Sequence, residues 1–135
     1  MSRKGFTLIE LLLVIAIIGL IGSIVMVGNR NAAEKRRDVK RVSDISELQK
    51  ALALHLAKVN SYPTLVGCIS GTDAVTAALT ASGFIAQSSR LVDPEWPSDT
   101  TKCYYYSGGA GKYTLRYTLE ATSSAGEIGD HSVVP

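Results

Sequence analysis

The sequence predicts an α+β fold in which one long N-terminal helix supports a small antiparallel β-sheet. Three features lead to this prediction. An uncharged apolar run opens the chain, apolar residues then recur every three or four positions, and two alternating segments flank a glycine-rich turn. At 135 residues, only one small globular unit fits once the apolar run is set aside.

The apolar run is long enough to span a bilayer. It follows a polar stub, residues 1–5, and extends from Phe6 to Val27. Its polar members are Thr7, Glu10 and Ser23. As a helix it would be about 33 Å long, close to the roughly 30 Å of a bilayer's hydrocarbon core. We therefore predict a transmembrane helix over 6–28.

The helical pattern continues beyond the apolar run. Apolar residues recur at helical spacing in Val39, Val42, Ile45, Leu48, Leu52, Leu56 and Val59. The opposite, polar face carries Asp38, Lys40, Arg41, Asp44, Glu47, Lys50 and Lys58. No proline interrupts 6–60, so 29–60 is predicted to extend the same helix as an amphipathic half. A cleavable secretory signal, which would end near Ser23 or Gly28, does not explain this continuation.

The head, residues 61–135, is predicted to begin where the long helix ends. Pro63 ends that helix because proline disfavours a helical conformation in the residue before it. A short helix is expected over 72–82, with Thr72 or Asp73 at its start and Gly83 at its stop.

Two strands are expected over 102–106 and 113–121, joined by a glycine-rich hairpin turn over 107–111. Residues 93–99 contain two prolines and are predicted to form a loop, and the tail after Thr122 an irregular strand or loop. The alternating residues of the second strand would pack against the apolar face of the long helix: Tyr113, Leu115, Tyr117 and Leu119.

Charge is segregated along the chain. Bases outnumber acids between Arg30 and Arg41, and acids outnumber bases beyond Asn60. The basic run has no interleaved aromatic residues, so nucleic acid is not expected as a primary partner. His55 and His131 are interpreted as surface or packing residues, and no catalytic constellation is visible, so we expect neither an enzyme nor a cofactor.

Cys68 and Cys103 are too far apart in the sequence for a CxxC motif. We predict that they form a disulfide that ties the loop after the long helix to the first strand, and the alternative is two separate buried thiols. A disulfide would place the head in an oxidising compartment.

The start of the apolar run resembles the processing site of type IV pilins and of the pseudopilins of type II secretion. The residues that carry the resemblance are Gly5, Phe6, Thr7, Leu8, Ile9 and Glu10. It extends closely to Gly19 and more loosely to Tyr62-Pro63. The resemblance implies that a prepilin peptidase cuts between Gly5 and Phe6 and methylates Phe6.

The resemblance also implies a location and partners. The subunit would be a single-pass membrane protein with its head outside the cytoplasm. It would then polymerise with other copies into an extracytoplasmic or cell-surface filament. Its other partners would be the prepilin peptidase, an inner-membrane assembly platform and, before assembly, membrane lipid.

Glu10 is the single charged residue of the apolar run. A carboxylate in a spanning segment costs about 2.5 kcal/mol or more, so it requires a partner. The resemblance implies that Glu10 pairs with the terminal amine of Phe6 on another subunit and sets the axial register. The simpler alternative is a capping box with Thr7, in which Glu10 satisfies the first amides of its own helix. Both are compatible before polymerisation.

Two glycines and a set of loop acids complete the resemblance. Gly19 and Gly22 would allow the helix to unwind in the filament, although Val27 stands where proline is usual. Loop acids would be candidates for calcium, which the C-terminal loops of major pseudopilins bind: Asp93, Glu95, Asp99, Glu127 and Asp130. Their spacing matches no recognisable calcium loop, so a solvated acidic surface is favoured.

The sequence thus favours a structural subunit of a type IV pilus-like filament. The alternative is a major-type pseudopilin of a type II secretion system. A third hypothesis is a monomeric membrane-anchored binding module. We favour the pilus subunit over the pseudopilin because no calcium-loop pattern is evident.

Overall fold

The chain forms two compact units, residues 1–34 and residues 35–135, the second of which we call the head unit. The computed structural model describes residues 5–86, 90–109 and 111–135, and for residues 24–30 it describes the backbone alone. Each unit is described by itself below.

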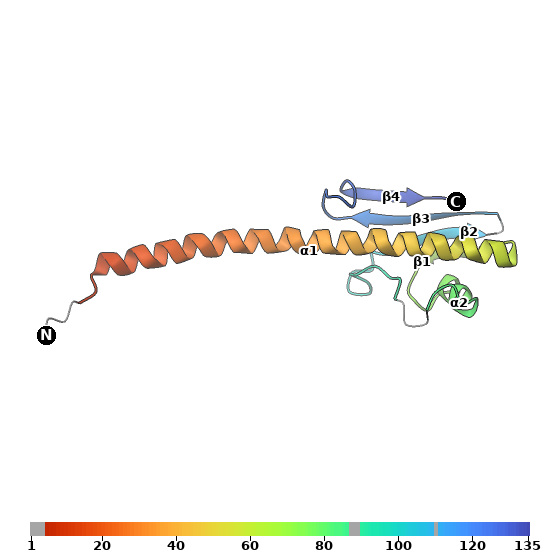
Figure 1. Cartoon of the computed structure of the whole chain (residues 1–135), viewed down its shortest axis with the longest axis horizontal. Coiled ribbons are helices and arrows are strands. Elements are labelled where there is room, and N and C mark those ends of the chain that lie inside the picture. Colours follow the sequence, from red (N-terminus) through yellow and green to blue (C-terminus); the bar gives the residue numbers. More distant parts are fainter. Residues whose placement is uncertain (1–4, 87–89, 110) are drawn as a thin grey trace. The chain divides into compact units, whose positions relative to one another are not determined.

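Helix α1 covers Leu8–Val59, 52 residues that include parts of both units (Figure 1). The prediction of one uninterrupted helix over 6–60 is confirmed to within two residues at each end. The helix ends where Asn60 adopts a left-handed conformation with φ of 58°. Asparagine tolerates this conformation better than most residues, so it is a suitable stop signal.

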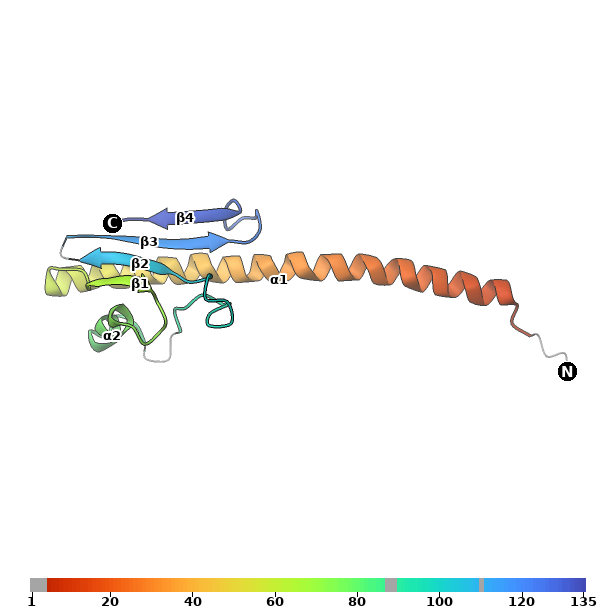
Figure 2. The same ribbon diagram turned by 180° about the vertical axis from the view of Figure 1, so that it is seen from behind.

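Four antiparallel strands form the sheet of the head unit. They are β1 (Leu65–Cys68), β2 (Tyr105–Gly109), β3 (Lys112–Leu119) and β4 (Gly129–Val133). Their spatial order follows the sequence, β1-β2-β3-β4. Figures 1 and 2 show the sheet along the second half of α1, with α2 (Ala74–Ala81) away from the sheet.

The strand prediction is correct for β3 and needs three corrections elsewhere. The first predicted strand, 102–106, begins later and continues through Gly108 and Gly109, so the glycines pair in the sheet rather than form the turn. Packing explains why residue 108 is a glycine, because a Cβ there would clash with the Tyr106 ring. Strand β1 was not predicted, and the irregular tail forms the regular edge strand β4.

The core of the head unit lies between α1, α2 and the inner face of the sheet. Ile45, Leu48 and Leu52 of α1 are buried in one cluster with side chains from all these elements. The predicted inner face of β3 is confirmed at Tyr113, Leu115 and Leu119, which are buried, while Tyr117 is partly buried. The predicted apolar stripe is wrong at its two ends, since Val39 and Val59 are exposed.

A disulfide joins Cys68 at the end of β1 to Cys103 just before β2, with the two Cα atoms 5.6 Å apart. The structure therefore confirms the predicted disulfide rather than the alternative of two separate thiols. It links residues 35 positions apart and fixes the edge strand to the chain that leads into β2.

Candidate assembly site and the Arg41 cluster

The carboxylate of Glu10 folds back onto the first turn of α1. Its Oε2 atom accepts hydrogen bonds from the Thr7 backbone N–H at 2.9 Å and from the Thr7 hydroxyl at 2.7 Å. The backbone N–H of Glu10 donates in turn to the Thr7 hydroxyl, with 3.4 Å between the nitrogen and the oxygen. This is the capping box that the sequence offers as the simpler alternative. The assembly role of Glu10 remains a prediction, because a second copy would have to replace Thr7 as its partner.

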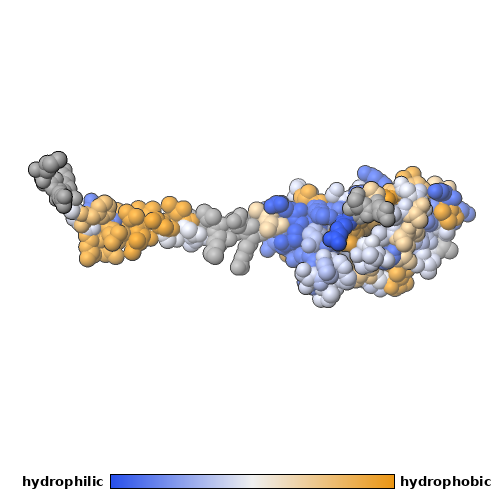
Figure 3. Space-filling model, turned by 90° about the horizontal axis from the view of Figure 1, so that it is seen from below, coloured by the Kyte–Doolittle hydropathy of each residue, from blue (hydrophilic) through white to orange (hydrophobic). Residues whose placement is uncertain are grey.

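Apolar side chains around this site are exposed to an unusual degree. Phe6 is 78% exposed and Ile9 is 74% exposed, and large apolar residues remain exposed as far as Ile21. Figure 3 shows this N-terminal stretch as almost continuously hydrophobic on the visible face. Such a surface requires a cover, because soluble monomers rarely expose contiguous apolar patches of this size.

Within the described residues, no helix has both the length and the hydropathy needed to cross a membrane. The predicted span over 6–28 includes residues 24–28, whose side chains lie outside the description.

Gly19 and Gly22 lie within the continuous helix α1. A Cβ added at either position would meet no other atom within 4 Å, so no contact within the described chain requires these glycines. Their role in unwinding stays a prediction about the filament.

The head unit holds a second concentration of polar chemistry, which the sequence did not predict. Asp38, Arg41 and Asp44 were assigned to the polar face of the helix, yet all three are buried. We call Arg41 and its charged neighbours the Arg41 cluster. It consists of Arg37, Asp38, Arg41, Asp93, Glu95 and Glu120.

Arg41 is the centre of this cluster. Asp93 accepts a bidentate pair of hydrogen bonds from it, at 2.7 Å from Nε and 2.9 Å from Nη2. Asp38 accepts from Nη1 at 2.8 Å and Glu95 from Nη2 at 3.1 Å. Glu120 also accepts from Nη1. A guanidinium has five N–H groups, and all five are used here.

Backbone groups and a second arginine complete the cluster. Asp38 accepts hydrogen bonds from the backbone N–H groups of Glu120 at 3.0 Å and Ala121 at 2.9 Å. Arg37 donates to Glu120 from Nε at 2.9 Å and also from Nη2. These bonds fasten the end of β3 to α1.

The electrostatics agree with a permanently charged cluster. Hydrogen bonds from Arg37, together with those from Arg41, hold the pKa of Glu120 down to about 2. Burial alone would lower the pKa of Arg41, but its carboxylate partners outweigh burial and raise it above its usual range. Nearby, burial raises the pKa of Tyr104, whose hydroxyl donates to Asp44 at 2.9 Å.

The calcium candidates do not converge on one site. Asp93 and Glu95 bind Arg41, whereas Asp99 accepts hydrogen bonds from Thr101 and Asp130 accepts one from Thr118. Glu127 is exposed. No group of three or more His, Cys, Asp or Glu in the described part of the chain is arranged to hold a metal ion. The expected solvated acidic surface is also incorrect for Asp93, which is buried.

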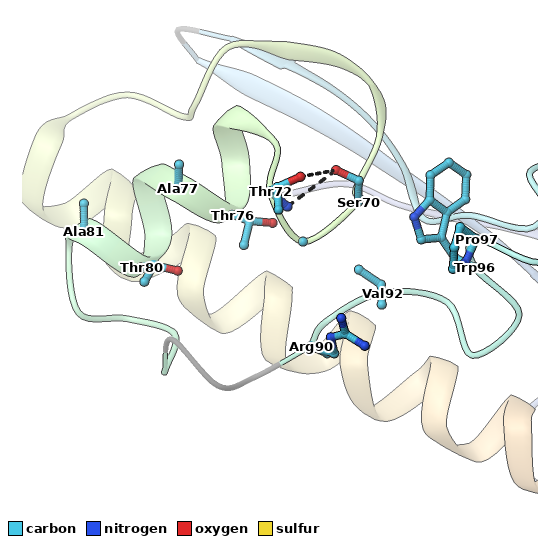
Figure 4. Close-up of a pocket in the computed structure, with 11 residues that line it drawn as sticks. Ser70, Thr72, Thr76, Ala77, Thr80, Ala81, Arg90, Val92, Trp96 and Pro97 are labelled. Carbon is cyan, nitrogen blue, oxygen red and sulfur yellow. Dashed lines mark hydrogen bonds between the residues drawn. The ribbon is translucent and has the colours of Figure 1, made fainter.

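A cavity of about 590 Å³ with both polar and apolar lining residues opens beside α2 (Figure 4). Hydroxyl groups from α2 and the turn before it line one side, and Arg90, Val92 and Trp96 line the other. The cavity contains no residue of the N-terminal motif or of the Arg41 cluster, so it is separate from both.

The two histidines serve packing, as expected. His55 is buried, with its Nδ1 atom 2.9 Å from the Ser61 carbonyl oxygen. The ring of His131 stacks on Tyr117.

Known proteins resemble the chain both in its N-terminal motif and along most of its length. Residues 1–26 match the prokaryotic N-terminal methylation motif. Over 134 residues the chain is 32% identical to the type II secretion system core protein G of Escherichia coli (strain K12), covering 95% of this chain and 86% of that protein. The protein of the same name from Klebsiella michiganensis is 39% identical over 66 residues, which are 47% of this chain and 44% of the relative. The Aeromonas hydrophila protein is 40% identical over 62 residues, 46% of this chain and 43% of the relative. No solved structure is significantly similar.

A methylation motif at the start of a long helix that carries a four-stranded antiparallel sheet defines a pilin-like protein. Pili and secretion systems both use such proteins, so the fold alone does not separate them. The chain belongs to the family of type II secretion system core protein G. This membership favours our alternative, the pseudopilin, over the pilus subunit that we placed first. It also agrees with the expectation of a structural protein rather than an enzyme.

Proposed function

We propose that this chain is a pseudopilin, a structural subunit that polymerises through its N-terminal helix as part of a type II secretion system. The observation that carries the proposal is the alignment with the Escherichia coli core protein G over 95% of the chain. The absence of a calcium-loop pattern, which favoured a pilus subunit, weighs less than similarity that extends through the head.

Processing would create the polymerising end. A prepilin peptidase would cut between Gly5 and Phe6 and methylate Phe6, in keeping with the methylation motif over residues 1–26. The new terminal amine would then lie four residues, or about 6 Å along a helix, from Glu10. A subunit displaced by about that distance could therefore present its amine to the carboxylate of its neighbour.

The exposed apolar side chains would need a cover at every stage. Before assembly, membrane lipid would cover them, with the head outside the cytoplasm. In the filament, other copies would replace the lipid and keep the same surface out of water, where its exposure would cost about 25 cal/mol for each Å². The inner-membrane assembly platform would be the partner that transfers the subunit between these two states. The filament itself would be a pseudopilus outside the cytoplasm.

Intact mass of the mature protein tests the processing step. We expect loss of Met1–Gly5 and one methyl group on Phe6. Gly5→Leu should block the cut, and Gly19→Leu is the matched control, since a Cβ at either glycine meets nothing within 4 Å. An uncut Met1, or a cut near Ser23 or Gly28, would contradict the proposal.

A deletion strain and sheared fractions of the wild type separate the remaining hypotheses. A pseudopilin predicts that exported proteins remain in the cell when the chain is deleted, while sheared fractions of the wild type contain no long pili made of this chain. A pilus subunit predicts the opposite result in both assays. If the processed chain stays entirely in the membrane as a monomer, it is a membrane-anchored binding module.

A further inference from the structure

We propose that Arg41 is the built-in cation of the head unit, the positive charge around which its carboxylates converge in place of a bound metal ion. The head would then fold without any divalent metal. The inference concerns the folding of the head and does not depend on which filament the subunit forms.

The surroundings of Arg41 are those of a bound cation. Its side chain has 0% exposure, and four carboxylates contact it, from Asp38, Asp93, Glu95 and Glu120. The hydrogen bonds use every N–H of the guanidinium. A hard divalent cation among the same side chains would likewise be surrounded by carboxylate oxygens.

The carboxylates come from three separate parts of the head unit. Asp38 lies on α1, Asp93 and Glu95 lie on the loop after α2, and Glu120 follows directly after β3. Without a positive charge between them, these segments would repel one another at close range. Arg41 therefore does what structural cations do in loop-rich domains, which is to hold acidic segments together.

The cluster leaves no oxygen atoms to coordinate a metal ion. The four carboxylates face only two guanidiniums, but backbone N–H groups supply further donors to Asp38 and Asp93. Among the described residues, every buried side-chain nitrogen and oxygen has a hydrogen-bond partner. Calcium needs six to eight oxygen ligands and would have to displace Arg41 to obtain them here.

An arginine differs from a bound ion in one testable respect. An ion exchanges with solution, so the stability of its site depends on metal concentration. A guanidinium is covalently attached and remains charged at every physiological pH. The stability of the head should therefore be the same in calcium and in chelator.

The wild-type full-length chain in detergent micelles provides the primary test. Thermal unfolding, followed by near-UV circular dichroism, is measured with EDTA and with millimolar calcium chloride. We expect midpoints that agree within about 1 °C. A calcium site with a dissociation constant a hundredfold below the calcium concentration would raise the midpoint by roughly 10 °C or more. A rise of that size would overturn the inference.

Variants test the role of Arg41 itself. Arg41→Ala leaves the carboxylates without their cation and should lower the midpoint by roughly 10 °C or more. Calcium chloride should then restore part of the loss, because the freed oxygens can serve as ligands. Arg36→Ala removes an exposed arginine of the same helix and should change the midpoint little.

Two results in the variants would contradict the inference. One is an Arg41→Ala variant that is no less stable than Arg36→Ala. The other is a folded Arg41→Ala variant that calcium does not stabilise, because its carboxylates would then not form a cation cage. If Arg41→Ala does not fold, the wild-type comparison in EDTA and calcium decides alone.

Discussion

At the scale of single residues, the head unit buries Asp38, Arg41 and Asp93 of the Arg41 cluster, although most of its other charged residues lie on the surface. Removing one partner from such a buried pair typically costs about 3 to 5 kcal/mol, because the remaining charge has no compensation. Exposed pairs contribute about 1 kcal/mol or less. The six residues of the cluster therefore matter more to the stability of the head than the other charged residues of the helix.

Glu120 should make this stability depend on pH in the acid range. Its pKa is about 2 in the folded chain, held down first by the hydrogen bond from Arg37, against 4.5 for an unperturbed glutamate. A carboxyl with a lowered folded pKa stabilises the protein above its unfolded pKa, and this stabilisation is lost as the pH falls towards the folded pKa. The free energy of unfolding should thus decrease between about pH 4.5 and pH 2.

Urea unfolding at a series of pH values measures this dependence. Glu120→Gln should lower stability at neutral pH and flatten part of the decrease in acid. Glu127→Gln changes an exposed acid and should leave the curve unaltered. Parallel curves for wild type and Glu120→Gln would show that Glu120 does not carry the dependence.

The position of Arg41 could not be predicted from the sequence, for a physical reason. Helical periodicity placed it on the polar face, and a lone arginine there is normally solvated. Its partners Asp93 and Glu120 are 52 and 79 residues away in sequence, so only the tertiary fold brings them together. The one local signal is Asp38, three residues earlier, which by itself predicts no more than a surface pair.

At the scale of elements, α2 depends on its N-cap. Asp73 accepts hydrogen bonds from the backbone N–H groups of Val75 and Thr76, both at 3.0 Å, at the start of an eight-residue helix. Asp73→Ala should lower the free energy of unfolding by about 1 kcal/mol, since a helix this short has few other sources of stability. Thr72→Ala, at the exposed neighbouring position, is the control and should be nearly neutral in urea unfolding.

The disulfide between Cys68 and Cys103 should stabilise the edge strand β1, which is only four residues long. A link across 35 residues is expected to contribute about 3 to 4 kcal/mol on the chain-entropy model. The double variant Cys68→Ser, Cys103→Ser should lose this amount in urea unfolding. Reductant should produce a similar loss in the wild type and none in the variant. Equal stability of both proteins would contradict a structural role.

Elements with a strong local pattern were predictable, and elements defined by their neighbours were not. Helix α1 and strand β3 repeat their apolar residues over many positions, so their periods are unambiguous. Strand β1 has only four residues, and β4 is the mixed sequence Gly129–Val133. Both lie at the edges of the sheet and become strands because β2 and β3 offer them hydrogen-bonding partners.

The methylation motif at the candidate assembly site was predictable because its signal is local, whereas the role of the site in assembly stays a prediction. A basic stub, a glycine, a phenylalanine and one acid fall within ten residues, and residues 1–26 match the methylation motif. The choice between pilus and pseudopilus depends instead on similarity along the head, which no motif within the chain displays.

At the scale of the whole molecule, the two units have opposite requirements. Large apolar side chains up to Ile21 are exposed and need a partner, whereas the head unit buries its own apolar core and pairs the charges of the Arg41 cluster within itself. Polymerisation through the N-terminal part alone would satisfy the first unit without disturbing the second. The single carboxylate of the apolar part is then the residue best placed to fix how the copies align.

Glu10→Ala should therefore abolish polymer while sparing the monomer. In the polymer, the terminal amine of Phe6 would lose its counter-ion in an apolar core, at a cost of about 2.5 kcal/mol per subunit, or roughly sixtyfold in each association constant. Processing, measured by intact mass, and head stability should stay at wild-type values because, within the described chain, the Glu10 carboxylate accepts hydrogen bonds from Thr7 alone. Glu47→Ala, which removes an exposed acid of the same helix, is the matched control.

Polymer length and yield, followed by cross-linking and electron microscopy, decide the question. Unchanged polymer in Glu10→Ala would leave Glu10 as nothing more than the capping partner of Thr7.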